Sequence, residues 1–253
     1  MIKKDFKARE LLEKSLVLYK KNFLTLFIIA FTPLFFSIFL SLTTNPYSSS
    51  VSSGFSNLIE GKNISFNILS LSTSILIVIL AFIVNSIIAS WGELALLTTV
   101  KNQERSIPEV GKQTWKKIIP FWLLSIIYYS ICSVGTILLI IPGILFIIWF
   151  SLCFWIFIDQ NIRGFDALKL SRKYMKGNVS YFLKKWLYLL IPYIIISIFL
   201  EIILKTTNSS DFVSRLIDNI FAALTGPIFT IYSYFIYQKI KSTKIKTIKR
   251  KKN

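Results

Sequence analysis

The sequence contains no histidine and only two cysteines, and these absences restrict the chemistry that the chain can perform. Without an imidazole it cannot form a Ser-His-Asp or Cys-His nucleophile system, an HExxH zinc site or a histidine proton relay. It also lacks the GxGxxG and GxxxxGK phosphate loops, and no pair of neighbouring carboxylates suggests acid–base catalysis. We therefore expect no catalytic residues, no metal ligands and no cofactor.

Charged residues are scarce, and acidic residues are the scarcer kind. Only 17% of the 253 residues are charged, with 12 Asp and Glu against 30 Lys and Arg, whereas 54% are hydrophobic. A typical soluble domain is about 45–50% apolar and about 25% charged. The composition therefore favours an integral membrane protein.

Long apolar segments predict six transmembrane helices, since a bilayer core of about 30 Å needs about 20 apolar residues per helix. The uncharged stretch from Ile118 to Ile158 has 41 residues, which is too long for one span and sufficient for two. We expect a tight hairpin here, with Pro142 and Gly143 as its structural turn. The other four spans are expected at about 23–42, 71–97, 186–204 and 220–238.

The basic residues are concentrated in every second one of the segments outside the predicted spans. When alternate segments are assigned to opposite sides of a bilayer, 27 of the 30 Lys and Arg fall on one side. This positive-inside bias predicts a protein of the cell membrane with both termini in the cytoplasm. The basic tail at 241–253 lacks aromatic residues on which bases could stack, so we expect it to contact anionic lipid and not nucleic acid.

Three basic segments have an amphipathic helical pattern. A helical wheel places Ser15, Thr114 and Ser171 near the middle of an apolar face, with charged residues opposite. We therefore predict an all-α polytopic membrane helix bundle, in which three cytoplasmic amphipathic helices accompany the six transmembrane helices. A threefold repeat of one amphipathic helix and one transmembrane hairpin is expected at about 5–100, 106–160 and 163–240. A Ser-rich loop at about 43–65 lengthens the first unit.

The basic faces of these helices are the predicted contacts with anionic lipid. Two arrangements remain open. The helices could lie in the headgroup plane, or they could pack on one another beneath the bundle, where a central small residue permits close approach. The candidate lipid contacts are Lys20, Lys21, Lys116, Lys117, Arg172, Lys173 and Lys176.

Several polar groups fall within or beside the predicted spans. Asn85 and Glu93 form a candidate intramembrane polar site, because polar residues within a membrane often have a functional role. The alternatives are that Asn85 joins helices and that Glu93 pairs with a basic residue near the interface. Asp159 is expected to be a solvated span end. Cys132 and Cys153 lie at similar depth, as free thiols or as a disulfide.

Short motifs in the second half of the chain resemble a bacterial family. They are Ile141-Pro142-Gly143, Ala167-Leu168, Ser171 and Lys176-Gly177, and the segment from Ser15 to Phe23 is similar to the family's opening helix. The family is that of the glycerophosphoryl diester phosphodiesterase membrane-domain-like proteins, and the resemblance implies a multi-pass membrane architecture. Some relatives carry a phosphodiesterase barrel whose active site uses His. This chain lacks His and has no room for a barrel of about 250 residues, so the activity is not expected here.

Three function hypotheses follow. The first is a non-enzymatic membrane scaffold, lipid-handling protein or accessory subunit. The second is a small-molecule or lipid transporter that uses Asn85 and Glu93, and the third is a membrane enzyme that uses Glu93 or Asp159 with a metal. The expected partners are a bilayer with an anionic inner leaflet, other membrane proteins or a second copy of the chain.

Overall fold

The computed structural model describes residues 8–59, 68–102, 107–207 and 210–252, which are helical except for short connections and contain no strand. This confirms the all-α prediction. The helices are α1 (Ala8–Lys21), α2 (Phe23–Ile59), α3 (Ile68–Asn102), α4 (Ile107–Trp115), α5 (Ile118–Leu138), α6 (Ile140–Phe150), α7 (Cys153–Gln160), α8 (Gly164–Met175), α9 (Val179–Thr206) and α10 (Asp211–Lys252).

Six segments of the described chain are long and apolar enough to cross a membrane. They lie in α2, α3, α5, α6 with α7, α9 and α10, so the predicted six-helix membrane bundle is confirmed. The prediction of a Ser-rich loop was wrong over most of its length, because α2 continues to Ile59. Serine hydroxyls in this part bond to carbonyls three or four residues earlier, as Ser50 does to Pro46, which satisfies them inside the helix.

The α5–α6 hairpin was predicted correctly, but its turn lies earlier than expected. The helix breaks at Leu139, whose φ of −157° and ψ of 130° are extended, and Pro142 lies in the first turn of α6. Proline is tolerated there because the first N–H groups of a helix have no partner within it. Gly143 instead allows α6 to pack closely against α5, because a Cβ on it would lie 2.6 Å from the Cα of Thr136.

The fourth span is broken in the middle, which the sequence did not predict. Helix α6 ends at Phe150 and α7 begins at Cys153. Ser171 of α8 is hydrogen-bonded to the backbone on both sides of the break. Its hydroxyl donates to the Trp149 carbonyl at 2.8 Å and accepts the Leu152 N–H at 3.2 Å. Cys153 beside the break is a buried free thiol, and Cys132 is also free.

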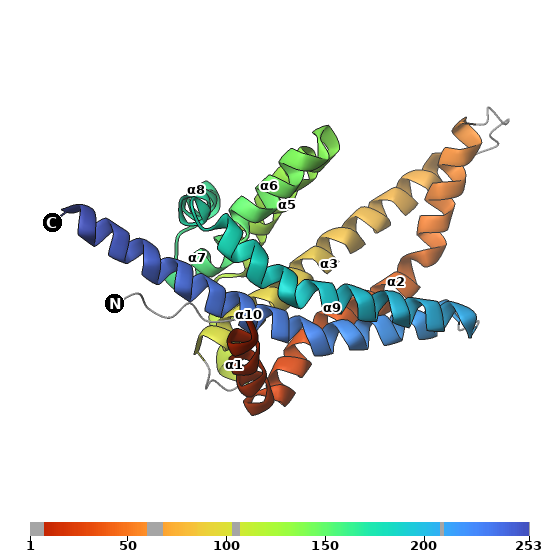
Figure 1. Ribbon diagram of the computed structural model, residues 1–253. Helices are drawn as coiled ribbons and strands as arrows, with labels where there is room; N and C mark the ends of the chain where they lie inside the picture. Colours follow the sequence, from red (N-terminus) through yellow and green to blue (C-terminus); the bar gives the residue numbers. More distant parts are fainter. Residues whose placement is uncertain (1–7, 60–67, 103–106, 208–209, 253) are drawn as a thin grey trace.

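The short helices α1, α4 and α8 lie at one end of the bundle and pack against the spanning helices (Figure 1). Helix α1 contacts α10, α4 contacts α3, and α8 contacts α5, α6 and α7. Ser15, Thr114 and Ser171 are 0%, 1% and 0% exposed, as expected for the middle of a buried face. The apolar faces are therefore covered mainly by spanning helices, rather than by lipid or by one another.

Helix α10 packs against both early and late helices of the chain, with contacts to α1, α2, α3, α8 and α9. Tyr19 on α1 donates to the Leu224 carbonyl on α10 at 2.9 Å, and burial raises the pKa of the Tyr19 hydroxyl. Away from this end the helical hairpins diverge from one another, as Figure 1 shows for the α5–α6 hairpin and the α2–α3 hairpin. Their large apolar side chains are exposed there, as a lipid environment requires.

Candidate functional site at helix α4

Helix α4 is short and is held by a small buried face. Val110 and Thr114 are buried, and the Thr114 hydroxyl donates to the Val110 carbonyl at 2.9 Å. The Lys117 N–H then donates to the Thr114 carbonyl at 2.9 Å, and α5 begins at the next residue. Lys116 and Lys117 therefore form the whole elbow between a short helix and a spanning helix.

A basic pocket of about 300 Å³ lies inside this elbow. Three of its lining residues are lysines, one from the end of α3 and two from the elbow, and the remaining polar residues are uncharged. The lining residues are Thr98, Lys101, Asn102, Gln113, Lys116, Lys117 and Ile158. We call this the basic pocket, and its donors suit an oxyanion such as phosphate.

The positive charge of the basic pocket is only partly neutralised. The Lys101 ammonium donates to the Ile158 carbonyl at 2.9 Å and lies 3.7 Å from an Asp159 carboxylate oxygen. Within the part of the chain that the structure describes, the ammonium groups of Lys116 and Lys117 make no hydrogen bond or ion pair with protein. An anion in the basic pocket would therefore meet two lysines whose charge no carboxylate balances.

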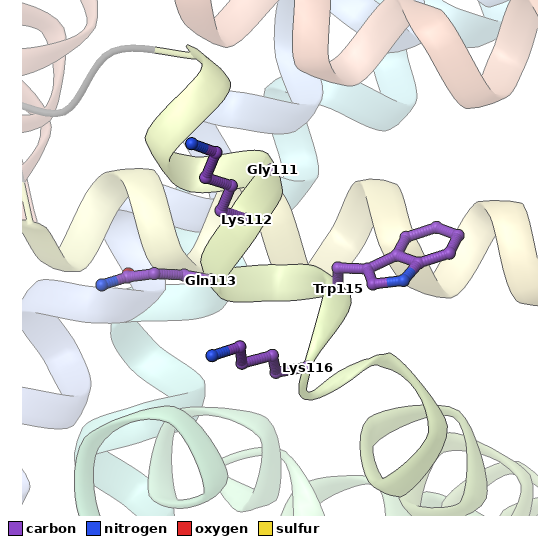
Figure 2. A pocket seen from close by; sticks show the side chains of 5 residues that line it. All are labelled: Gly111, Lys112, Gln113, Trp115 and Lys116. Atoms are coloured by element: carbon purple, nitrogen blue, oxygen red, sulfur yellow. The ribbon is translucent and has the colours of Figure 1, made fainter.

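A second, shallower hollow of about 580 Å³ lies on the outer side of α4. Gln113 and Lys116 line it and the basic pocket alike, together here with Gly111, Lys112 and Trp115. Figure 2 shows the Trp115 ring pointing away from the side where Lys112, Gln113 and Lys116 lie. Trp115 is 72% exposed, and an exposed Trp beside lysines is typical of a protein surface at the membrane–water interface.

A network of side chains behind the basic pocket fixes the position of Lys101. An Asp159 carboxylate oxygen accepts the Tyr237 hydroxyl at 2.7 Å and also the Lys241 ammonium. The Gln160 amide donates to the hydroxyls of Tyr237 and Tyr174, each at 3.1 Å. Asp159 is thus a partly buried acceptor that links α3, α7 and α10, and the prediction of a solvated span end was wrong.

The other predicted lipid contacts lie outside the basic pocket. Lys20 and Lys21 are exposed at the end of α1, and Lys173 and Lys176 are exposed on α8 and at its end. The Arg172 guanidinium lies over the Trp149 ring at 4.6 Å. Lys116 and Lys117 are thus the two predicted lysines that share a cavity. The charge pattern of the sequence does not distinguish Lys101 from other basic residues, because its approach to the elbow depends on packing.

The predicted intramembrane pair is not brought together. Glu93 lines a separate cavity between α3 and α5, and Asn85 is not among the residues that line it. Two turns of α3 separate the two side chains. Groups of three or more residues that could hold a metal ion were not found in the described part of the chain.

Comparisons of the chain with protein-family models, with curated proteins and with solved structures found no match. The resemblance to the glycerophosphoryl diester phosphodiesterase membrane-domain-like family therefore stays an expectation.

Proposed function

We propose that the protein is a non-enzymatic, lipid-handling protein of the cell membrane, which binds phosphate head groups of anionic phospholipids in the basic pocket. The observation that carries this proposal is the gathering of Lys101, Lys116 and Lys117 around one cavity, with no carboxylate among the residues that line it. Each lysine near an anionic membrane surface contributes about 1 kcal/mol to association.

The surroundings of the basic pocket suit a lipid better than a free anion. A cavity of about 300 Å³ accepts a phosphate and its polar substituent but not two acyl chains. Ile119 and Leu123, in the first turns of α5, are large exposed apolar residues along which chains can lie. Trp115 adds an interfacial anchor beside the same elbow. With both termini in the cytoplasm, the lipid would belong to the inner leaflet.

The test is a count of bound lipids by native mass spectrometry on the full-length protein, released from nanodiscs of mixed phosphatidylglycerol and phosphatidylcholine. We expect the unmodified protein to retain phosphatidylglycerol, and Lys116→Gln/Lys117→Gln to lose this preference. Lys20→Gln/Lys21→Gln is the matched control, because it removes the same charge from residues that do not line the basic pocket. An equal loss in both variants would refute a defined site.

A further inference from the structure

A second cavity, of about 620 Å³, lies between α3 and α5 within their membrane-spanning segments. Its walls are apolar and aromatic side chains interrupted by hydroxyl groups, with one carboxylate. The lining residues are Phe82, Ile83, Ser86, Ala89, Ser90, Glu93, Trp122, Ser125, Ile126, Tyr129 and Ser130. We call this the Glu93 cavity.

Glu93 is the single charged residue among those that line this cavity. Its carboxylate has no hydrogen-bond or ion-pair partner among the described residues, and no lysine or arginine reaches the cavity wall. The pairing with a neighbouring basic residue that was considered from the sequence is therefore absent in this part of the chain. An ionised carboxylate at membrane depth is costly, so the group holds its charge only when a positive charge accompanies it. The cavity thus favours a cationic occupant and repels a phosphate.

Two of the three aromatic side chains in the wall, Trp122 and Tyr129, favour the same sign of charge. The Trp122 ring N–H donates to the Ser86 hydroxyl at 3.0 Å, which holds the indole between α5 and α3. Tyr129 lines the cavity two turns further along α5. Aromatic faces attract organic cations, and Trp is the strongest of them, which is why quaternary ammonium groups bind among aromatic side chains.

The mouth of the cavity faces the lipid phase. Phe82 is 73% exposed and Tyr129 is 55% exposed, although both lie in segments long and apolar enough to span the membrane. Glu93 precedes Lys101 by eight residues of α3, which corresponds to about 12 Å along a helix. An occupant must therefore reach Glu93 through hydrocarbon, which requires an apolar body around its charge.

We propose that the Glu93 cavity binds a lipophilic monocation, meaning one ammonium or phosphonium centre surrounded by apolar groups. Glu93 is its counter-ion, and Trp122 and Tyr129 form its aromatic walls. This site differs from the basic pocket in the sign of the charge that it selects, so either proposal can fail without the other. It also gives the transporter hypothesis a specific ligand class.

The test uses equilibrium binding of radiolabelled tetraphenylphosphonium to the full-length protein in nanodiscs of neutral phosphatidylcholine. We expect saturable binding of one ion per chain, and Glu93→Gln should weaken it by at least about tenfold, because a buried charge pair is lost. Glu201→Gln is the matched control, since Glu201 is exposed and paired with Lys205 at 2.7 Å, and it should bind as the unmodified protein does. Tetraphenylborate has the same shape and the opposite charge, so in a separate assay it should show no saturable binding that depends on Glu93.

Saturable, Glu93-dependent binding of tetraphenylborate in its own assay would overturn the proposal, as would unchanged binding of tetraphenylphosphonium in Glu93→Gln. If Glu93→Gln does not give a monodisperse protein, binding of tetraphenylphosphonium to Ala89→Phe provides the test instead. This change fills the cavity and keeps the carboxylate, because Ala89 is an exposed lining residue. Loss of tetraphenylphosphonium binding in folded Ala89→Phe supports the site, and retained binding refutes it.

Discussion

The hydroxyl of Ser171 lies 2.8 Å from the carbonyl oxygen of Trp149, at the point where the fourth span breaks. The same hydroxyl accepts the N–H of Leu152 at 3.2 Å, so one side chain of α8 satisfies backbone groups that the break leaves free. Unpaired backbone groups are costly in a membrane, which has no water to satisfy them. Ser171 thereby couples the position of a short helix to the shape of a spanning one.

Substitution of Ser171 tests this coupling. We expect Ser171→Ala to lower the free energy of unfolding by about 1–3 kcal/mol, the cost of leaving a buried polar group without its partner. Ser15→Ala is the matched control, because Ser15 is equally buried but, among the described residues, its hydroxyl bonds only to the Leu11 carbonyl of its own helix. The measurement is reversible unfolding of the protein by sodium dodecyl sulfate in mixed micelles. Equal effects of the two changes would contradict the role given to Ser171.

The α5–α6 hairpin depends on the absence of a side chain at residue 143. A Cβ there would lie 2.3 Å from the Thr136 hydroxyl oxygen and 2.6 Å from its Cα, so Gly143→Ala must push the two helices apart. We expect a loss of about 1–3 kcal/mol in the free energy of unfolding, which is typical of overpacking.

Gly226→Ala provides the comparison for this glycine. It also lies in a spanning segment, but among the described residues a Cβ there would meet nothing within 4 Å beyond the backbone of its own helix turn. Because alanine is the better helix former, Gly226→Ala should leave the stability unchanged or raise it by up to about 1 kcal/mol. A neutral Gly143→Ala in the same assay would show that the hairpin is not closely packed at Thr136.

The Asp159 network should contribute more to stability than an exposed ion pair. Asp159→Asn removes the charge that accepts Tyr237 and Lys241, and we expect a loss of about 1–3 kcal/mol on unfolding. Asp166→Asn breaks the exposed pair with Lys169 at 3.6 Å, and it should cost about 0–1 kcal/mol.

A double-mutant cycle of Asp159→Asn with Tyr237→Phe isolates the hydrogen bond between these two residues. We expect the two changes to be non-additive, because both remove the same 2.7 Å contact. Additive losses would mean that Asp159 acts through Lys101 and Lys241 alone.

Hydropathy and charge were sufficient to predict the membrane bundle and its six spans. The bundle and its spans follow from local sequence, since each spanning segment must form its own backbone hydrogen bonds and present apolar side chains to the lipid. The helical wheel likewise identified Ser15, Thr114 and Ser171 as buried, because the period of the apolar residues fixes which face is covered.

Packing decided what the sequence did not predict. A Pro-Gly pair is typical of turns, but Pro142 is equally compatible with the first turn of a helix, and the chain breaks at Leu139. The break before Cys153 is bonded on both sides by Ser171, which lies on another helix, α8. The basic pocket needs Lys101 beside Lys116 and Lys117, and only the approach of α3 to the elbow supplies that neighbour.

The most direct test of the lipid-handling account is crosslinking with phosphatidylglycerol that carries a photoactivatable diazirine close to its head group. After illumination in membranes, the labelled residues are mapped by mass spectrometry. We predict that labelling is concentrated in α4, the elbow and the end of α3, and that Lys116→Gln/Lys117→Gln removes it. Labelling spread over all basic segments, and unchanged in that variant, would contradict a defined headgroup site.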